Sequence, residues 1–134
     1  MKKCGILNSQ LSKVIASMGH TDKLVICDSG LPIPRGFETV DLALTANIPK
    51  FIDTLRVVLD ELKVEEITIA SEMEQLNNGL YKQVTSLFPG IKINKITHED
   101  FKKLTHQSAT VAFVRTGEAT PYANIILSSG VTFS

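Results

Sequence analysis

Residues 19–34 read GHTDKLVICDSGLPIP, and this stretch indicates how the rest of the chain is organised. Its apolar run predicts a short buried strand over residues 23–28. His20 and Asp22 precede the run, Asp28 ends it, and a proline-rich loop follows. A buried strand does not itself require acidic residues at both ends. The polar residues that flank the run are therefore candidates for a functional site.

An amphipathic helix is expected directly before this strand. Residues 8–18 place apolar side chains at i, i+3, i+4 and i+7, which is one face of a helix. Asn8 or Ser9 can cap its start, and Gly19 can end it in the left-handed conformation.

The rest of the chain alternates between the two kinds of element. Further strands are expected at residues 38–44, 65–70, 91–97, 110–116 and 124–133, and helices at residues 51–62, 73–88 and 98–104. Pro49 suits the first turn of the second helix, and Asn77, Asn78 and Gly79 weaken the third. The order predicts an α/β fold with a mainly parallel or mixed sheet between helical layers. The length suits one domain over residues 1–134.

The composition favours a small, uncharged ligand. Fourteen basic residues balance fourteen acidic ones, which argues against nucleic acid or a membrane surface as partner. The two cysteines make no disulfide or metal framework, and Cys27 is expected to be a buried apolar side chain. Neither a signal peptide nor an apolar run of about 20 residues is present, so the expected location is the cytoplasm.

Familiar catalytic motifs are absent. The chain has no GxGxxG, GxxxxGK[ST], HExxH or GxSxG pattern. His20, Asp22 and His98 could be proposed as metal ligands, but their spacing matches no metal motif, and a site without metal or cofactor is expected.

Polar residues at the ends of several elements could meet at one edge of the sheet. Ligands bind beyond the carboxyl ends of strands in such sheets, where Asp28, His98, Tyr122 and Asn124 are expected. Each also has an ordinary structural explanation. His98, for example, can be the N-cap of a short helix, and Lys102 can lie on its solvated face. Their shared position at element ends favours a site.

Four blocks of sequence carry a resemblance to a known family. They read MKKCGILNSQL, GHTDKLVICDSGLPIP, THEDFKKLT and RTGEATPYANIIL, and they run from one end of the chain to the other. The chain resembles the D-ribose pyranases, the ribose branch of the ribose and fucose mutarotases. The form DSGLP, where fucose relatives tend to have DANFP, favours ribose.

The resemblance implies an isomerase that interconverts the pyranose and furanose forms of D-ribose without a cofactor, in ring-like homodecamers. It implies that His20 is the proton donor. The sugar-binding residues that it implies are Asp28, His98, Lys102, Tyr122 and Asn124. Two alternatives stay open: an L-fucose mutarotase, and a non-catalytic sugar-binding subunit of a ribose uptake system.

The predicted strand separates two of these residues. A strand over residues 23–28 spans roughly 15–20 Å at ~3.3 Å per residue, which puts His20 and Asp28 at opposite ends. Either the chain folds back sharply, or two subunits share one site. The apolar segment 124–133, with no helix after it, is expected to be an exposed edge that a neighbouring subunit covers.

Overall fold

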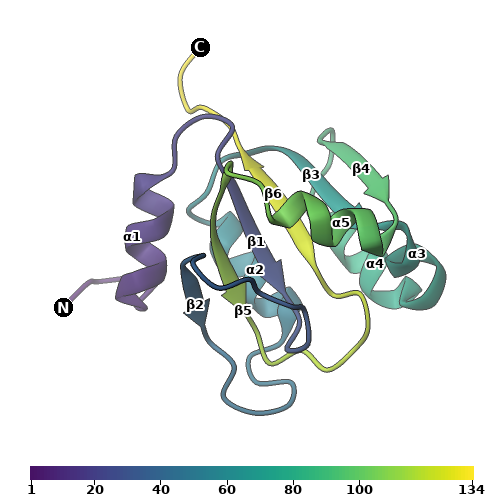
Figure 1. Ribbon diagram of the computed structural model, residues 1–134. Helices are drawn as coiled ribbons and strands as arrows, with labels where there is room; N and C mark the ends of the chain where they lie inside the picture. Colours follow the sequence, from purple (N-terminus) through teal and green to yellow (C-terminus); the bar gives the residue numbers. More distant parts are fainter.

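The apolar run of residues 23–27 forms β1, which lies inside a six-stranded sheet (Figure 1). The computed structural model describes residues 1–134. Its strands are β1 (Lys23–Cys27), β2 (Thr39–Asp41), β3 (Val64–Ala70), β4 (Lys92–Ile96), β5 (Thr110–Arg115) and β6 (Ile125–Ser129), in the order β2-β5-β1-β6-β3-β4. Only β6 runs antiparallel to its neighbours. The predicted mixed α/β sheet is therefore confirmed.

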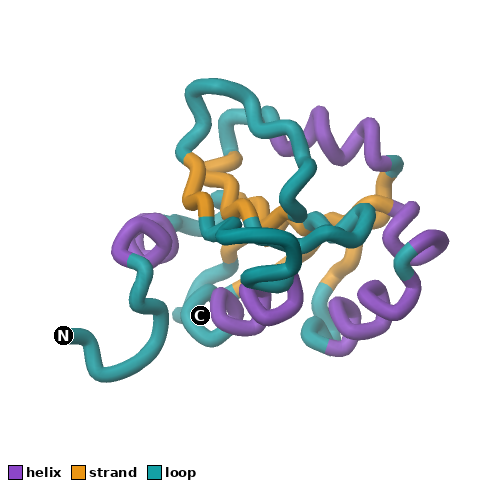
Figure 2. The backbone as a smooth tube through the Cα atoms, turned by 90° about the horizontal axis from the view of Figure 1, so that it is seen from below, coloured by secondary structure: helices purple, strands orange, loops and turns teal.

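Helices cover both faces of the sheet (Figure 2). They are α1 (Ser9–Ser17), α2 (Phe51–Leu59), α3 (Ser71–Leu76), α4 (Asn78–Ser86) and α5 (His98–Thr105). Because successive strand residues face opposite sides, Leu24 and Ile26 join the larger apolar cluster with α1, α2 and α4. Val25 and Cys27 join a smaller cluster with Phe101 of α5. No helix is long and apolar enough to span a membrane.

The first helix is capped as predicted, but it ends differently. Asn8 Oδ1 accepts a hydrogen bond from the backbone N–H of Leu11 at 2.8 Å. The left-handed residue after the helix is Thr21, with φ of 71°, and not Gly19, so that prediction is wrong. Gly19 instead donates its N–H to Asp22 Oδ2 at 2.8 Å, which fixes the turn. Asp22 therefore acts as a turn residue that binds nearby backbone.

The start of α2 also differs from the prediction. Pro49 lies outside the helix, because Lys50 is the N-cap and Phe51 the first helical residue. Lys50 supplies no side-chain cap. The cap comes from Glu118, whose Oε1 accepts the N–H of Phe51 at 2.9 Å.

The predicted helix over residues 73–88 is two helices. α3 and α4 meet at Asn77, which has φ of −144° and ψ of 55°. The Asn77 amide donates to Thr120 Oγ1 at 3.1 Å and to the carbonyl of Pro121 at 2.9 Å. The break therefore directs a polar side chain toward a distant loop.

The last strand is not an exposed edge, so that prediction is wrong. β6 lies between β1 and β3, and all five of its residues are buried. Its apolar residues face both clusters, since Ile125 and Leu127 join the larger one and Ile126 the smaller. The edges of the sheet are β2 and β4, of which β4 exposes Lys92 and Lys95.

Candidate functional site

Four of the predicted site residues meet at the carboxyl end of β1. Asp28, His98 and Tyr122 line one cavity of about 250 Å³, together with Gly30, Leu31, Pro32 and Pro121. Asn124 lies at the start of β6, the antiparallel neighbour of β1. Its Oδ1 accepts the backbone N–H of Asp28 at 2.9 Å. The sheet thus brings together Asp28, His98, Tyr122 and Asn124.

The Asp28 carboxylate is partly withdrawn from water. Its Oδ1 accepts the N–H of Gly30 at 3.0 Å. Burial raises the pKa of Asp28 above its ordinary value, and this outweighs the lowering by the backbone N–H groups of Gly30 and Leu31, by the Asn124 side chain and by His98. The Asp28 carboxylate is therefore a hydrogen-bond acceptor at this edge of the sheet that has lost part of its hydration.

His98 and Tyr122 pack against each other. Their rings are 5.1 Å apart at 80°, an edge-to-face arrangement. Tyr122 has φ of 60°, a left-handed conformation that is uncommon outside glycine. Strained backbone of this kind clusters at ligand sites. His98 is the first residue of α5 and not its N-cap, because Thr97 Oγ1 accepts the N–H of Asp100.

Two buried nitrogen atoms in this cluster have no hydrogen-bond partner. They are His98 Nδ1 and Asn124 Nδ2. Nearly all buried polar groups in proteins are paired, so each unpaired atom calls for an explanation. Asn124 is 1% exposed, which leaves its amide no free access to bulk water. Together with the Asp28 carboxylate, they supply hydrogen-bonding groups for a ligand with several hydroxyls.

His20 and Lys102 lie outside this cluster. His20 precedes β1, at the opposite end from Asp28, and lines a separate cavity of about 270 Å³ that includes Ser129 and Phe133. Lys102 pairs with Glu99 at 2.8 Å and does not line the cavity of Asp28. The predicted separation of His20 from Asp28 is confirmed within one chain.

No feature of the sequence indicated the partner of His20. His20 Nε2 lies 3.0 Å from Glu65 Oε2 and 3.1 Å from Oε1. Glu65 reaches His20 because the starts of β1 and β3 lie on either side of the end of β6. No local pattern in the sequence encodes this strand order.

Glu72 was also missed. Both of its carboxylate oxygens accept the backbone N–H of His98 at 3.0 Å. Although partial desolvation raises it, the pKa of Glu72 is held below its ordinary value by the N–H of His98 and other hydrogen bonds. Glu72 lies two residues after the end of β3, a strand that points toward the site. An acidic residue in that position is the signal that could have identified it.

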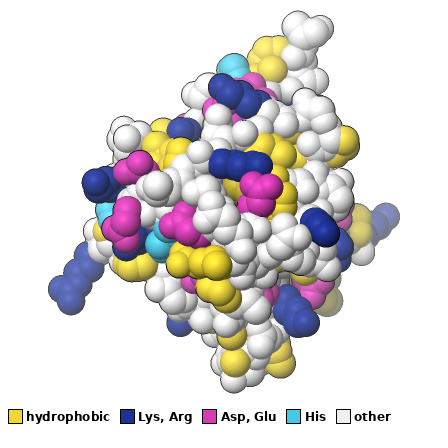
Figure 3. Space-filling model, turned by 90° about the vertical axis from the view of Figure 1, so that its right-hand side faces the viewer, with side chains coloured by type: hydrophobic (Ala, Val, Ile, Leu, Met, Phe, Trp, Pro, Cys, Tyr) yellow, Lys and Arg dark blue, Asp and Glu magenta, His cyan; other side chains and the backbone are white.

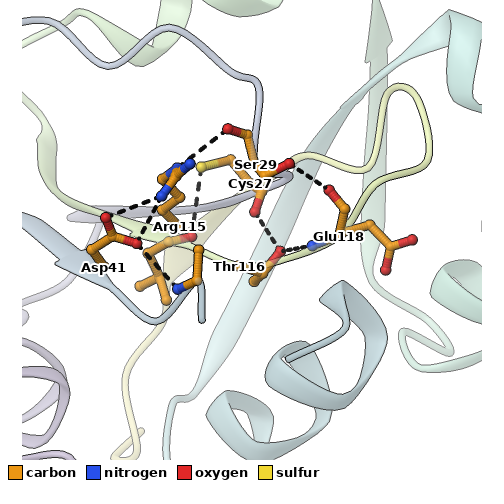
Figure 4. Close-up of polar contacts among 8 residues, drawn as sticks. Cys27, Ser29, Asp41, Arg115, Thr116 and Glu118 are labelled. Carbon is orange, nitrogen blue, oxygen red and sulfur yellow. Dashed lines mark hydrogen bonds and ion pairs between the residues drawn. The ribbon is translucent and has the colours of Figure 1, made fainter. Parts of the chain in front are cut away.

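Arg115, Ser29 and Glu118 fix the loop that carries Asp28 (Figure 4). The carbonyl of Glu118 accepts from the N–H of Ser29 at 3.0 Å and from its Oγ at 3.1 Å. Arg115 Nε donates to the Ser29 carbonyl at 3.2 Å, and Arg115 also pairs with Asp41 at 3.1 Å. The loop is thus anchored on two sides before any ligand binds.

The side chains of this structure form neither a metal-binding cluster nor a reactive thiol site. His20 and His98 lie at opposite ends of the sheet, so the set His20, Asp22 and His98 is not brought together. No group of three or more His, Cys, Asp or Glu side chains is placed to hold a metal ion. Cys27 is fully buried, and burial raises its pKa to about 12. The prediction that Cys27 is a buried apolar side chain is confirmed, and its raised pKa makes the reactive thiolate unfavourable.

The face of the molecule shown in Figure 3 has no large patch of a single charge. On the face shown in Figure 3, acidic and basic side chains are interspersed. This distribution accords with the equal numbers of acidic and basic residues. Electrostatic attraction would therefore contribute little to ligand capture on this face.

Comparisons with known proteins identify the family of this chain. Residues 1–132 match the model of the RbsD / FucU transport protein family. A D-ribose pyranase of Coprothermobacter proteolyticus is 56% identical over 99% of this chain and 100% of its own length. One from Clostridium tetani is 53% identical, again over 99% of this chain and 100% of the relative.

Two solved structures that contain a bound sugar are similar in fold to this chain. Bacillus subtilis RbsD complexed with D-ribose has a TM-score of 0.94 and 47% identity, covering 99% of this chain and 100% of that one. A Streptococcus pneumoniae fucose mutarotase in complex with L-fucose has a TM-score of 0.75 at 24% identity and covers 95% of each chain, a likeness of fold alone. From its whole-length match and its fold, this chain belongs to the RbsD / FucU transport protein family.

Proposed function

We propose that this protein is a D-ribose pyranase, an isomerase that interconverts the pyranose and furanose forms of D-ribose. The observation that carries the proposal is the pair of buried, unpartnered nitrogens of His98 and Asn124 beside the carboxylate of Asp28. Full-length identity of about half or more to D-ribose pyranases supports ribose as the substrate. Fucose has only a likeness of fold behind it.

The cluster suits an open-chain sugar. Asp28 accepts from hydroxyl hydrogens, while Asn124 Nδ2 donates to a hydroxyl oxygen. His98 Nδ1 donates or accepts according to its tautomer. Tyr122 closes one side of the cavity with its ring. We assign these four residues to sugar binding. Lys102 keeps the role that the resemblance implies only if the sugar or a neighbouring subunit draws it from Glu99.

The reaction needs proton transfer and no electron transfer. A base takes the proton of the anomeric hydroxyl as the bond from C1 to the ring oxygen breaks, and an acid protonates that oxygen. In the aldehyde that results, a different hydroxyl attacks C1, and its proton leaves as the carbonyl oxygen gains one. Histidine serves as acid and as base near neutral pH. We assign the proton donor to His20, whose ring Glu65 holds in place.

A shared site follows from the position of His20. Within one chain His20 and the Asp28 cluster face opposite ends of β1, so a neighbouring copy would supply His20 to each cluster. Exposed apolar side chains offer surface for such an assembly; among them are Leu7, Leu44, Ile48, Val57 and Phe133. Phe133 lines the same cavity as His20. The ring-like decamer that the resemblance implies would provide the neighbour.

Saturation-transfer NMR on D-ribose tests the function directly. The method follows exchange between ring forms, and the protein should accelerate it well beyond the rate in buffer. L-Fucose measured in the same way should exchange more slowly. Unchanged ribose exchange would refute the proposal, and faster fucose exchange would move the assignment to the fucose mutarotases.

A further inference from the structure

Glu118 is a buried carboxylate without a basic partner. It is 7% exposed and forms no salt bridge. Oε1 accepts the backbone N–H of Phe51 at 2.9 Å, and Oε2 accepts the hydroxyl of Thr120 at 2.8 Å. A buried charge is unfavourable unless such hydrogen bonds hold it, and the N-terminus of a helix favours an anion. Both oxygens are therefore committed to fixed structure.

The hydroxyl of Thr120 extends this contact to a second element. Thr120 Oγ1 accepts from Asn77 Nδ2 at 3.1 Å while it donates to Glu118. Asn77 also donates to the carbonyl of Pro121 at 2.9 Å. The loop before Tyr122 is thus held from the start of α2 on one side and from the break between α3 and α4 on the other.

The main chain of the same residue holds the other half of the site. The Glu118 carbonyl accepts both the N–H and the Oγ of Ser29, directly after Asp28 (Figure 4). Asp28, Glu118 and Thr120 line a common cavity of about 270 Å³. Glu118 therefore touches both loops that carry the sugar-binding cluster, while its own carboxylate oxygens are satisfied by protein.

We infer that Glu118 is a positioning residue for the sugar site: its carboxylate fixes residues 118–120 at the start of α2, and its carbonyl thereby holds the Asp28 loop beside the Tyr122–Asn124 loop. This inference rests on the proposed function, because it assumes that the two loops bind one sugar. Hydrogen bonds to a charged group are among the stronger ones, and their loss would let the loops separate.

Three variants separate positioning from simple stabilisation. Glu118→Gln keeps the size of the side chain but replaces one carboxylate oxygen by an NH2 group. The variant therefore cannot accept hydrogen bonds at both positions, from Phe51 and from Thr120. Thr120→Val removes the hydrogen bonds of the Thr120 hydroxyl to Glu118 and Asn77 and leaves the cap of α2 intact. Asp53→Asn is the matched control, since Asp53 is an exposed acid in the first turn of the same helix and pairs only with Arg56.

The readouts are KM and kcat for ribose exchange, melting temperature, and hydrogen exchange at the Ser29 amide. We expect Glu118→Gln and Thr120→Val to raise KM at least about tenfold, on the scale of one hydrogen bond to a charged group. The Ser29 amide should exchange faster in Glu118→Gln. Asp53→Asn should stay within about twofold of the wild type.

Two results would overturn the inference. One is a wild-type KM in both variants; the other is a lower melting temperature of Glu118→Gln with KM and kcat of the folded protein unchanged. If Glu118→Gln does not fold, KM of Thr120→Val decides. If the wild type does not accelerate ribose exchange, the proposed function fails. Exchange at the Ser29 amide, compared with Asp53→Asn, then still decides whether Glu118 fixes the loop.

Discussion

At the scale of single residues, Asp28 illustrates a conflict between stability and binding. Its carboxylate lies at the end of a buried strand, and no basic side chain forms a salt bridge with it. The raised pKa shows that the folded protein holds the charged form less favourably than water does. The sugar-binding role proposed above for Asp28 would account for a carboxylate held at this cost.

The pH dependence of stability follows from the direction of this shift. The folded state binds the Asp28 proton more tightly than the unfolded state, so this group's contribution to stability falls as pH rises from about 4, its unfolded pKa, through the raised folded value. Asp28→Asn removes that loss. Urea unfolding should therefore show the variant gaining on the wild type as pH rises through this window.

Glu72→Gln supplies the opposite control. The pKa of Glu72 is lowered, so its contribution is present above the unfolded pKa and is lost as pH falls through the folded value. The wild type should gain on this variant as pH rises. The same slope for both variants would contradict the assignment of opposite shifts.

His20 carries the prediction on catalysis. His20→Ala should leave folding and ribose binding near those of the wild type and reduce ring exchange ~10²–10⁴-fold, the usual contribution of a positioned acid or base. His106→Ala is the matched control, because His106 is exposed at the end of α5 and lines neither cavity. Saturation-transfer NMR and ribose titration give both quantities. Wild-type exchange in His20→Ala would make His20 structural.

At the scale of elements, the loop after β5 depends on a close backbone approach at Gly117. A Cβ there would lie 2.5 Å from the carbonyl oxygen of Ile48 and would also meet that of Thr45. Gly117→Ala should destabilise the fold by about 1–3 kcal/mol, as overpacking does. It should also weaken ribose binding, since Glu118 follows directly. Chemical unfolding and ribose titration measure the two effects.

Gly79→Ala provides the comparison within a helix. Gly79 lies in α4, and no atom lies within 4 Å of the position of its Cβ. Because glycine weakens helices, the substitution should stabilise the protein by roughly 0.5–1 kcal/mol. Equal effects of the two alanines would show that crowding at Gly117 is not the cause.

Local sequence patterns predicted most helices and strands, and they also predicted the cluster of polar residues at the carboxyl end of β1. Asp28, His98, Tyr122 and Asn124 could be grouped because each lies at the end of an element, and such ends gather at sheet edges. What local patterns could not supply were contacts across long sequence separations. The cap of α2 by Glu118, 67 residues away, is one of them. The turn of Asn77 toward Pro121 is another.

At the scale of the whole molecule, strand order was the main gap. The apolar residues of β6 are compatible with a covered edge and with a central strand, and only the complete sheet decides between them. The exposed-edge argument for a shared site therefore fails. The separation of His20 from Asp28 by the length of β1 remains. The argument for a shared site now rests on this separation and on the exposed apolar residues.

A complementation experiment tests the shared site. Subunits with His20→Ala are mixed with subunits with Asp28→Ala under conditions that allow exchange. If each site takes the two residues from different copies, about a quarter of the sites recover both, because random mixing leaves each residue intact in half of the positions. Ring exchange should return to about that fraction of the wild-type rate.

The control mixes two differently tagged preparations of His20→Ala, which cannot restore a site. Native mass spectrometry confirms that mixed assemblies have formed. Mixed assemblies of His20→Ala and Asp28→Ala that stay inactive would mean that both residues act within one chain.

The central place of β6 has a consequence for how the chain is made. During synthesis β1 and β3 leave the ribosome long before residues 125–129, which pair with both of them. Until residues 125–129 have emerged, the nascent chain has two separate half-sheets with unsatisfied inner edges, and only β6 can join them. Productive folding of the sheet should therefore wait for β6, and a premature stop codon before residue 125 should send the product to proteases or chaperones.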